Sequence, residues 1–324
     1  MKFPQSFIFL LPLFLLAACG KDDDVVDPGA NSDNANANAV LAETLYTEST
    51  TSAAVRTHAQ YGYEMPRLKQ GSGDAFVVHT LPDGRVNYCL EYNTKLRAAY
   101  WTAYKWYAGF SSNYGDSKWN RNQWRQGETF NGYSGSSGPF QPDPVLPQGV
   151  RTDLSDYSGS GYQRGHMLGS ADRLNSKEAN GQTFYLSNIH PQMSTFNEQG
   201  IWYNLEIFLR DNYDTASFRD TLYVVKGGTI SQGSYTLLRG SLVRPNYYYM
   251  AILRYKASDR TNGGYAGIAF WMEHRPNTDA VSAKYAISID ELEAKTGIDF
   301  FCNLPDDIEN NAERTCVPTF WKLK

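Results

Sequence analysis

The sequence predicts an α+β fold in which a central, largely antiparallel sheet is flanked by helices and long loops. The 324 residues include 23 tyrosines, and aromatic residues make up 14% of the chain, which favours strands. Several apolar runs alternate with the two-residue period of a strand, whereas only two segments show the period of a helix. A hydrophobic content of 41% is sufficient for one large buried core.

The first 18 residues are predicted to be a lipoprotein signal peptide. Lys2 precedes an apolar run at residues 7–16, which is too short to cross a bilayer as a helix but suits an export signal. The following Ala17-Ala18-Cys19 resembles the end of a bacterial lipobox, in which the cysteine is acylated and the chain is cut before it. We therefore expect an exported bacterial lipoprotein, held at the outer membrane or cell surface through lipidated Cys19. The alternative is an ordinary signal peptide with an incidental cysteine.

Residues 19–58 are predicted to be a flexible acidic tether, and residues 59–324 a single folded domain. Residues 19–45 hold one lysine and six acidic residues, and the alternating Asn and Ala at 34–39 offer little apolar surface to bury. The net charge of −4 therefore comes from the leader, and the domain is neutral. A domain surface that is basic overall is excluded, so any phosphate binding must be local.

The domain begins with a predicted β-hairpin. Alternating apolar residues at 75–78 and 85–92 flank the turn sequence Pro82-Asp83-Gly84. Residues 108–161 show little periodicity, and a loop of this length inside a compact domain is usually functional. Further strands are predicted at residues 100–107, 183–187, 221–226, 247–255 and 267–272.

Two helices are predicted in the second half of the chain. Trp202 and Leu205 lie on the apolar face of a helix at residues 199–211. A second helix is expected to begin near Ser288, because this residue and Glu291 have the spacing of a capping box.

The cysteines are expected in an oxidising compartment, because the leader predicts export. Cys302 and Cys316 lie close together near the C-terminus and are candidates for a disulfide, which would leave Cys89 free. A zinc site built from these three cysteines is the alternative, but paired CxxC spacing is absent.

Chemically functional side chains concentrate between residues 162 and 210. His166 suits a general base near neutral pH, and Arg164 and Arg210 offer forked donors for phosphate oxygens. Amides in this segment and the carboxylate of Glu206 supply the oxygen ligands that Mg²⁺ prefers. The sequence has no GxSxG motif and no cysteine near the histidine. The set therefore predicts metal-assisted hydrolysis of a phosphodiester by water.

This segment resembles the DNA/RNA non-specific endonucleases, the ββα-metal (His-Me finger) group that includes endonuclease G. The likeness begins at Arg164-Gly165-His166, which matches the Arg-Gly-His motif of that family. The resemblance covers roughly residues 60–320, and it implies the ββα-metal nuclease fold and a magnesium-dependent endonuclease of DNA and RNA. Further matching positions follow in the family's order: Asn188, Pro191, Gln192, Asn197, Trp202, Leu205 and Glu206.

The resemblance also implies a role for each residue around the metal. His166 would act as the general base that deprotonates the attacking water. Asn197 would be the direct protein ligand of a single Mg²⁺, with Mn²⁺ as the alternative ion. Glu206 would hold the waters bound to that metal. The products would carry 5′-phosphate ends.

The remaining implied roles concern the substrate. Arg164 and Arg210 would steady the phosphate, and Asn188 would help to fix the histidine region and the substrate. An additional arginine of the family, contributed by the preceding loop, maps to either Arg121 or Arg125. Contacts to phosphate and sugar predict little sequence preference.

Two positions depart from the family pattern. Gln163 stands where the family usually has an aspartate before Arg-Gly-His, so the pH dependence is expected to differ. Asn197 and Glu206 are nine residues apart, where eight is usual. Because nine residues would turn the two side chains to opposite sides of one regular helix, we expect the extra residue to be accommodated before the helix, near Gly200, or by a π-bulge.

The other histidines are interpreted as structural at His58, His79 and His274, while His190 is expected at a strand end near the substrate. The alternative function is a catalytically inactive surface lipoprotein that binds glycans or peptides on a nuclease scaffold. A neutral domain and Gln163 favour that alternative, and the oligomeric state is left open.

Overall fold

The computed structural model describes residues 37–38, 44–48, 62–69, 73–110, 119 and 121–324. The expected signal peptide at residues 1–18, Cys19 and His58 lie outside the described residues. Within the described part of the chain, no helix combines the length and apolar character needed to cross a membrane.

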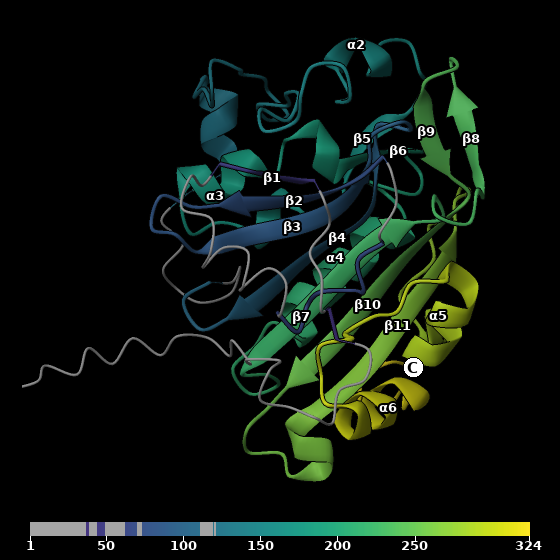
Figure 1. Cartoon of the computed structure of the whole chain (residues 1–324). Coiled ribbons are helices and arrows are strands. Elements are labelled where there is room, and N and C mark those ends of the chain that lie inside the picture. Colours follow the sequence, from purple (N-terminus) through teal and green to yellow (C-terminus); the bar gives the residue numbers. More distant parts are fainter. Residues whose placement is uncertain (1–36, 39–43, 49–61, 70–72, 111–118, 120) are drawn as a thin grey trace, which may run out of the picture.

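An eight-stranded sheet runs through the domain in the order β1-β2-β3-β4-β7-β10-β11-β12 (Figure 1). Every neighbouring pair is antiparallel except β1 and β2, which are parallel. The prediction of an α+β fold with a largely antiparallel central sheet is therefore confirmed. The strands are β1 (Leu45–Thr47), β2 (Asp74–Thr80), β3 (Val86–Asn93), β4 (Ala98–Tyr107), β7 (Thr221–Gly228), β10 (Tyr247–Tyr255), β11 (Tyr265–Glu273) and β12 (Ala286–Ile287).

Two smaller ribbons and several short helices surround this sheet. The ribbons pair β5 (Gln163–His166) with β6 (Ile189–Gln192), and β8 (Tyr235–Leu238) with β9 (Leu242–Pro245). The α-helices are α2 (Leu154–Tyr157), α3 (Lys177–Gln182), α4 (Ile201–Asn212), α5 (Ile289–Thr296) and α6 (Asp306–Arg314). The 3₁₀ helices are η2 (Arg121–Gln126), η3 (Ser170–Asp172), η4 (Leu186–Asn188), η5 (Thr261–Gly264) and η6 (Ala283–Tyr285).

Both faces of the sheet are buried, which explains why its strands are apolar on both sides. In β10, Tyr249 and Leu253 point into one core cluster, and Met250 and Ile252 point into the other. Helices α5 and α6 pack into the first cluster, and α4 packs into the second. The two helical coverings therefore lie on opposite faces of the sheet.

Most of the predicted elements are present. The first hairpin forms as β2 and β3, and Gly84 has the positive φ of 86° that its turn requires. The predicted strand at 247–255 is β10, and the predicted helix at 199–211 is α4. Ser288 caps α5 as expected, because its hydroxyl accepts the backbone N–H of Glu291 at 3.1 Å.

The strand predicted at residues 183–187 is wrong. The segment forms turns instead, since the N–H groups of Thr183, Phe184 and Tyr185 each donate to the carbonyl three residues earlier. Its apolar side chains fill a third core cluster beside the sheet. The segment makes an isolated parallel bridge between Tyr185 and Gln141 but belongs to no strand, so burial accounts for the apolar run.

The predicted disulfide between Cys302 and Cys316 is also wrong, because both cysteines are free. Helix α6 lies between them in the sequence. Cys89 is also free, and it is buried.

Part of the predicted tether belongs to the fold. Leu45–Thr47 form β1 at the edge of the sheet, and Asn38 is buried with its backbone N–H bonded to Asn303 Oδ1 at 3.0 Å. The predicted tether of residues 19–58 is therefore too long at its C-terminal end.

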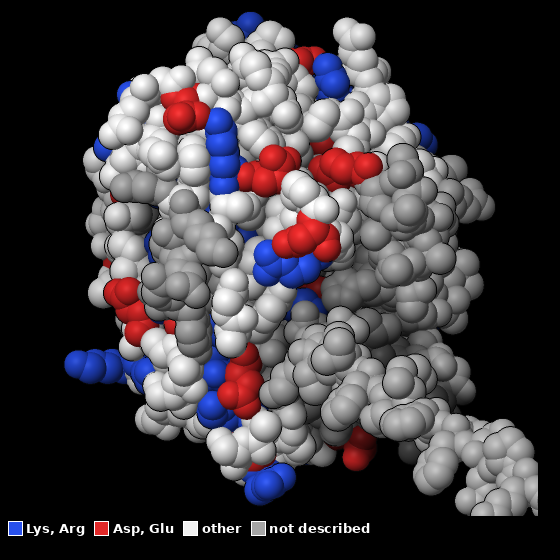
Figure 2. All heavy atoms as spheres, turned by 90° about the vertical axis from the view of Figure 1, so that its left-hand side faces the viewer, with Lys and Arg blue, Asp and Glu red and all other residues white. Residues whose placement is uncertain are grey.

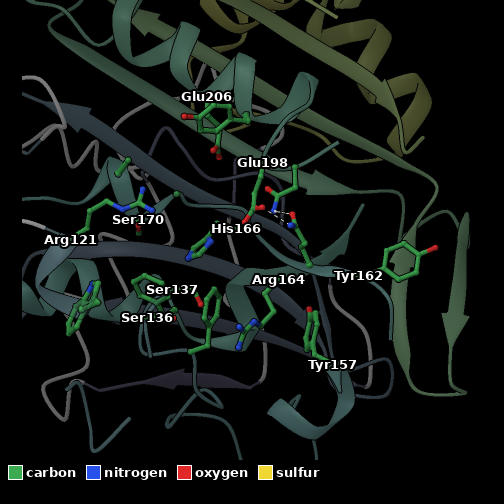
Figure 3. A pocket seen from close by; sticks show the side chains of 18 of the residues that line it. Arg121, Ser136, Ser137, Tyr157, Tyr162, Arg164, His166, Ser170, Glu198 and Glu206 are labelled. Carbon is green, nitrogen blue, oxygen red and sulfur yellow. Dashed lines mark hydrogen bonds between the residues drawn. The ribbon is translucent and has the colours of Figure 1, made fainter. Parts of the chain in front are cut away.

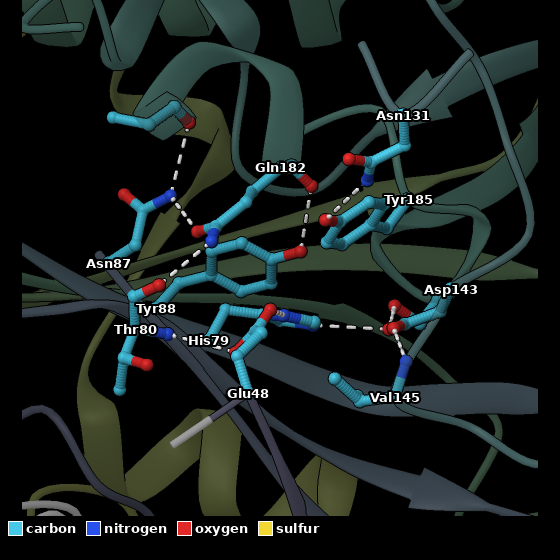
Figure 4. A network of polar contacts seen from close by, with 12 residues as sticks. Glu48, His79, Thr80, Asn87, Tyr88, Asn131, Asp143, Val145, Gln182 and Tyr185 are labelled. Carbon is cyan, nitrogen blue, oxygen red and sulfur yellow. Dashed lines mark hydrogen bonds and ion pairs between the residues drawn. The ribbon is translucent and has the colours of Figure 1, made fainter. Parts of the chain in front are cut away.

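A buried histidine holds this N-terminal segment against the domain (Figure 4). The ring of His79 lies between two carboxylates, with Nδ1 2.6 Å from Glu48 Oε1 and Nε2 3.0 Å from Asp143 Oδ2. Burial alone lowers the pKa of His79, but the charges of Glu48 and Asp143 outweigh it and raise the pKa to about 10. The structural interpretation of His79 is confirmed.

We predict that His79→Ala lowers the free energy of unfolding by about 3–5 kcal/mol, because it leaves Asp143 buried without its partner. Urea denaturation measures this loss. Arg85→Ala is the control, since its ion pair with Asp83 is exposed and contributes at most about 1 kcal/mol.

The stability difference between the wild type and His79→Ala should also depend on pH. Because the folded-state pKa of His79 lies above its unfolded value, this advantage of the wild type should be full below pH 6.5 and shrink toward pH 10. An advantage that grows with pH would contradict the ion-pair assignment.

Candidate active site

One pocket of about 670 Å³ gathers most of the predicted site residues (Figure 3). Its wall is built from η2, the loop at residues 136–140, α2, β5, η3, the turn before α4 and α4 itself. The prediction that the long segment at 108–161 is functional is supported, because η2 and residues 136–140 line this pocket. Of the six predicted site residues, five lie on the pocket wall: Arg164, His166, Asn197, Glu206 and Arg210.

Two short strands and a helix form the framework of the site. β5 and β6 pair so that Gly165 lies opposite His190 and His166 opposite Ile189. A Cβ on Gly165 would lie 2.1 Å from Gln192 Oε1, so this position of the Arg-Gly-His motif must be glycine. The ribbon is fastened to the sheet, since Tyr248 donates from its hydroxyl to the carbonyl of Pro191 at 2.8 Å.

Helix α4 is attached directly to the strand that carries the histidine. Trp202 is fully buried, and its Nε1 donates to the backbone carbonyl of His166 at 3.2 Å. Asn197 precedes the helix, which begins at Ile201. The extra residue between Asn197 and Glu206 is therefore accommodated before the helix, as expected.

The His166 ring sits in a largely apolar environment. Its centroid lies 5.3 Å from that of Phe140 and 5.0 Å from that of Phe184. Burial, followed by the positive charge of Arg121, lowers the pKa of His166 to about 3. Among the described residues, Nε2 of the ring has no hydrogen-bond partner, and His166 lines the pocket. The imidazole is thus neutral at physiological pH and has a free lone pair.

Asn197 is oriented by the residue that departs from the family pattern. Gln163 Oε1 accepts a hydrogen bond from Asn197 Nδ2 at 3.1 Å, and Gln163 Nε2 donates to Glu198 Oε2 at 2.6 Å (Figure 3). The amide oxygen of Asn197 is thereby left for a ligand. Gln163 also connects this amide to the carboxylate of Glu198, so a negative charge still lies nearby.

A network of four charges lies at the base of the pocket. Lys226 Nζ donates to Glu206 Oε1 at 2.9 Å, and Arg210 Nη1 donates to Asp172 Oδ1 at 2.8 Å. Lys226 also lies 3.7 Å from Asp172, so it bridges the two acids. Burial alone raises the pKa of Asp172, but Lys226 and Arg210 hold it below its usual value. Glu206 and Arg210 therefore do not form a simple surface pair along the helix.

Arginines give the pocket a local positive charge. Four arginines and two glutamates line its described part: Arg121, Arg125, Arg164, Arg210, Glu198 and Glu206. The guanidinium of Arg164 lies 4.0 Å from the ring centroid of Phe140. Elsewhere, on the face drawn in Figure 2, basic and acidic side chains are interspersed. The neutral domain thus concentrates positive charge where a phosphate would bind.

Asn188 fulfils the first part of its predicted role, because it fixes the histidine region, but it does not line the pocket, so its predicted contact with the substrate is wrong. It is fully buried, its Oδ1 accepts the N–H of Leu168, and its Nδ2 donates to the carbonyls of Leu168 and Thr183. The residue positions the chain just after His166 and has no atom free for substrate. Its role is to hold the histidine strand.

Two further histidines are structural. His190 is buried and donates from Nε2 to the carbonyl of Ala99 at 3.1 Å, so the expectation that it lies near the substrate is wrong. His274 is buried, and its Nδ1 lies 3.1 Å from the carbonyl oxygen of Pro245, which confirms that this histidine is structural.

Sequence reasoning missed the residues that surround and support these groups. Asp172 follows the Arg-Gly-His motif by only six residues and Lys226 lies later in β7, but no local pattern marks either residue. Phe140 and Glu198 gave no signal either, although Glu198 is adjacent to Asn197. Arg121 and Arg125 were left as alternatives, and both line the pocket.

The oxygen donors of the pocket fit a hard divalent cation. Asn197 offers an amide oxygen and Glu206 a carboxylate, both half-buried on the same wall. Among the described residues, no group of three His, Cys, Asp or Glu side chains in this pocket is close enough to enclose an ion. Such a sparse set suits Mg²⁺, which keeps several of its waters.

The ββα framework, the neutral histidine and these oxygen donors define a hydrolase that acts on phosphodiesters. A sequence profile of the DNA/RNA non-specific endonuclease family matches residues 76–307. A nuclease from Nostoc sp. is 32% identical over 234 residues, which cover 70% of this chain and 75% of that protein. Nuclease C1 from Cunninghamella echinulata var. echinulata is 31% identical over 230 residues, which cover 68% of this chain and 82% of that protein. The chain therefore belongs to the DNA/RNA non-specific endonuclease family.

The fold agrees with this assignment. A chain in the crystal structure of the EndoG/EndoGI complex superimposes with a TM-score of 0.58 and covers 79% of this chain and 94% of its own length. The two sequences are 21% identical, so this similarity concerns the fold. The predicted EndoG-like fold is confirmed, and nucleic acid is the substrate class of the family.

We predict that Arg121→Ala moves the acid limb of the pH profile of kcat/KM to higher pH. The positive charge of Arg121 lowers the pKa of His166, and its loss also admits water to the ring, so both effects raise that pKa. In the wild type the acid limb should lie below pH 6.5. Arg125→Ala is the matched control, because it changes the same wall of the pocket and should leave the limb in place. An unmoved limb in Arg121→Ala would exclude His166 as the titrating base.

Proposed function

We propose that this chain is an exported, lipid-anchored, Mg²⁺-dependent endonuclease that hydrolyses DNA and RNA with little sequence preference and leaves 5′-phosphate ends. The observation that carries the proposal is the meeting of His166 and Asn197 on one arginine-lined pocket. The neutral ring supplies a base, and the amide supplies an oxygen ligand. Mn²⁺ is the alternative ion.

His166 takes the proton from the attacking water. Burial keeps its ring neutral, so the imidazole has a lone pair available at the pH of the exported compartment. Phe140 and Phe184 hold the ring on two sides, and the Trp202 hydrogen bond fixes its backbone. The base is thus positioned before the substrate arrives.

The arginines bind and orient the phosphodiester. Arg164 is half-buried against Phe140 and has planar donors for phosphate oxygens. Arg210 is already paired with Asp172, so its main effect is a fixed positive charge at the base of the pocket. These arginines would contact phosphate groups, which are the same in every nucleic-acid sequence. Such contacts therefore support hydrolysis with little sequence preference.

Asn197 and Glu206 would hold the divalent cation. Gln163 fixes the amide of Asn197, and Lys226 fixes the carboxylate of Glu206. When bound there, Mg²⁺ stabilises the negative charge that develops on the phosphate and on the leaving 3′ oxygen. Cleavage of the bond between the phosphorus and the 3′ oxygen leaves the phosphate on the 5′ end of the product.

The central experiment is a digestion assay on DNA and RNA with the purified mature chain. EDTA should abolish cleavage, and His166→Ala should lower kcat by about 10²–10⁴-fold because the general base is lost. Added imidazole should restore part of the activity of the variant, while the urea midpoint confirms that it folds. Product ends should accept a 5′-phosphate-dependent ligase without prior phosphorylation. Absence of cleavage with every divalent metal would leave the inactive binding lipoprotein as the better account.

Asn197→Ala should raise the Mg²⁺ concentration needed for half-maximal activity by at least about 10-fold, because one oxygen ligand is lost. Gln199→Ala is the matched control, since it changes an exposed amide in the same turn and should leave the requirement unchanged. An unchanged requirement in Asn197→Ala would remove this residue from the metal site.

Export and anchoring are supported by the leader alone. The apolar run at residues 7–16 and the small residues before Cys19 suit cleavage and acylation at that cysteine. In bacteria that express the full chain, the wild type should incorporate labelled palmitate and sediment with membranes. Cys19→Ser should lose both properties, whereas Cys316→Ser should keep them. A wild-type chain that stays unlabelled would contradict the anchor.

A further inference from the structure

The C-terminal helix pair is strongly acidic, although the domain as a whole is neutral. Residues 289–314 contain eight acidic and two basic residues. Both basic residues are engaged with neighbours, since Lys295 Nζ lies 3.4 Å from Glu291 Oε1 and Arg314 donates to Asn311 Oδ1 at 2.7 Å. Helices α5 and α6 pack on the opposite face of the sheet from α4, so this acidic region is separate from the nuclease pocket (Figure 1).

Three of these acids converge at one point between the helices. One carboxylate oxygen each from Asp290, Glu293 and Glu313 lies within 4.8 Å of the others. Ca²⁺ binds oxygens at 2.3–2.6 Å, so two of its ligands are at most about 5 Å apart. The spacing of the three oxygens therefore matches a shared calcium ion.

Glu313 gives an independent indication of a missing ligand. Its side chain is buried, with 6% of the residue exposed, and its Oε1 has no hydrogen-bond partner. It also lies in the last turn of α6, where the helix dipole disfavours a negative charge. An acid in this position is costly unless a cation or a donor compensates it.

The neighbours of Glu313 make its charge still less favourable. Carboxylate oxygens of Asp290 and Glu293 lie within 4.8 Å of one of its own, so like charges meet at one point. One oxygen of Glu293 accepts the backbone N–H of Phe300 at 2.7 Å. A divalent cation would replace this repulsion with attraction to all three carboxylates.

We propose that Asp290, Glu293 and Glu313 bind one calcium ion that joins α5 to α6. The donors are all oxygens, as Ca²⁺ prefers, and three carboxylates supply more than enough negative charge. Asp290 is exposed and Glu293 half-buried, so the ion can enter from solvent and complete its shell with water. The site stabilises the helix pair against the sheet and takes no part in phosphodiester hydrolysis.

The test is thermal denaturation of the full mature chain after removal of metals, with CaCl₂ added at constant ionic strength. The melting temperature should rise saturably, by about 3–8 °C at 10 mM Ca²⁺, with half of the effect at about 10⁻⁴–10⁻³ M. MgCl₂ should give a smaller rise at the same concentrations, because Mg²⁺ dehydrates reluctantly and demands a stricter geometry.

Glu313→Gln should abolish the calcium response and melt at or above the wild-type temperature without calcium, because it removes a buried acid. Asp290→Asn changes an exposed residue, so it should fold normally and require about tenfold more Ca²⁺. Asp307→Asn is the matched control, since it removes a charge from α6 outside the cluster and should respond like the wild type.

Asn197→Ala should keep the calcium response, which separates this site from the nuclease pocket. Glu313→Gln should also keep its Mg²⁺-dependent nuclease activity. The proposal is overturned if Ca²⁺ gives no saturable rise beyond that of Mg²⁺, or if the rise persists in Glu313→Gln.

Discussion

The hydrogen bond from Trp202 Nε1 to the carbonyl of His166 joins the helix of the site to its strand. Trp202 is fully buried in the core between α4 and the sheet, so this link cannot shift without disturbing that core. Asn188 holds the chain just beyond the histidine in the same way, by bonding its amide to the backbone. The position of the base relative to α4 is therefore set by core packing.

Burial of the histidine ring and of the charged side chains sets the chemistry of the site. An imidazole between Phe140 and Phe184 loses its hydration, which keeps it neutral and available as a base. Lys226 and Arg210 pair with the acids below it and hold the pKa of buried Asp172 below its usual value. The cost of burying these charges is offset by their mutual pairing. A neutral domain can thus offer phosphate a positive pocket.

The sequence predicted the elements with strong local periodicity, such as β10, α4 and the β2–β3 hairpin, and it placed five of the six site residues on one pocket. It missed β5 and β6 because these strands are four residues long, contain few apolar residues and include a proline. It gave Asn188 a substrate role because the motif cannot distinguish an amide bonded to backbone from one facing a ligand. The supporting charges, Asp172 and Lys226, come together only through tertiary packing.

The most direct test of the central claim is a crystal structure of His166→Ala with Mn²⁺ and a short DNA duplex, since the variant should bind without cleaving. The account predicts an anomalous manganese peak bonded to the side-chain oxygen of Asn197. The scissile phosphate should lie beside that ion, facing the space left by the missing imidazole. Manganese bound elsewhere, or DNA bound outside this pocket, would contradict it.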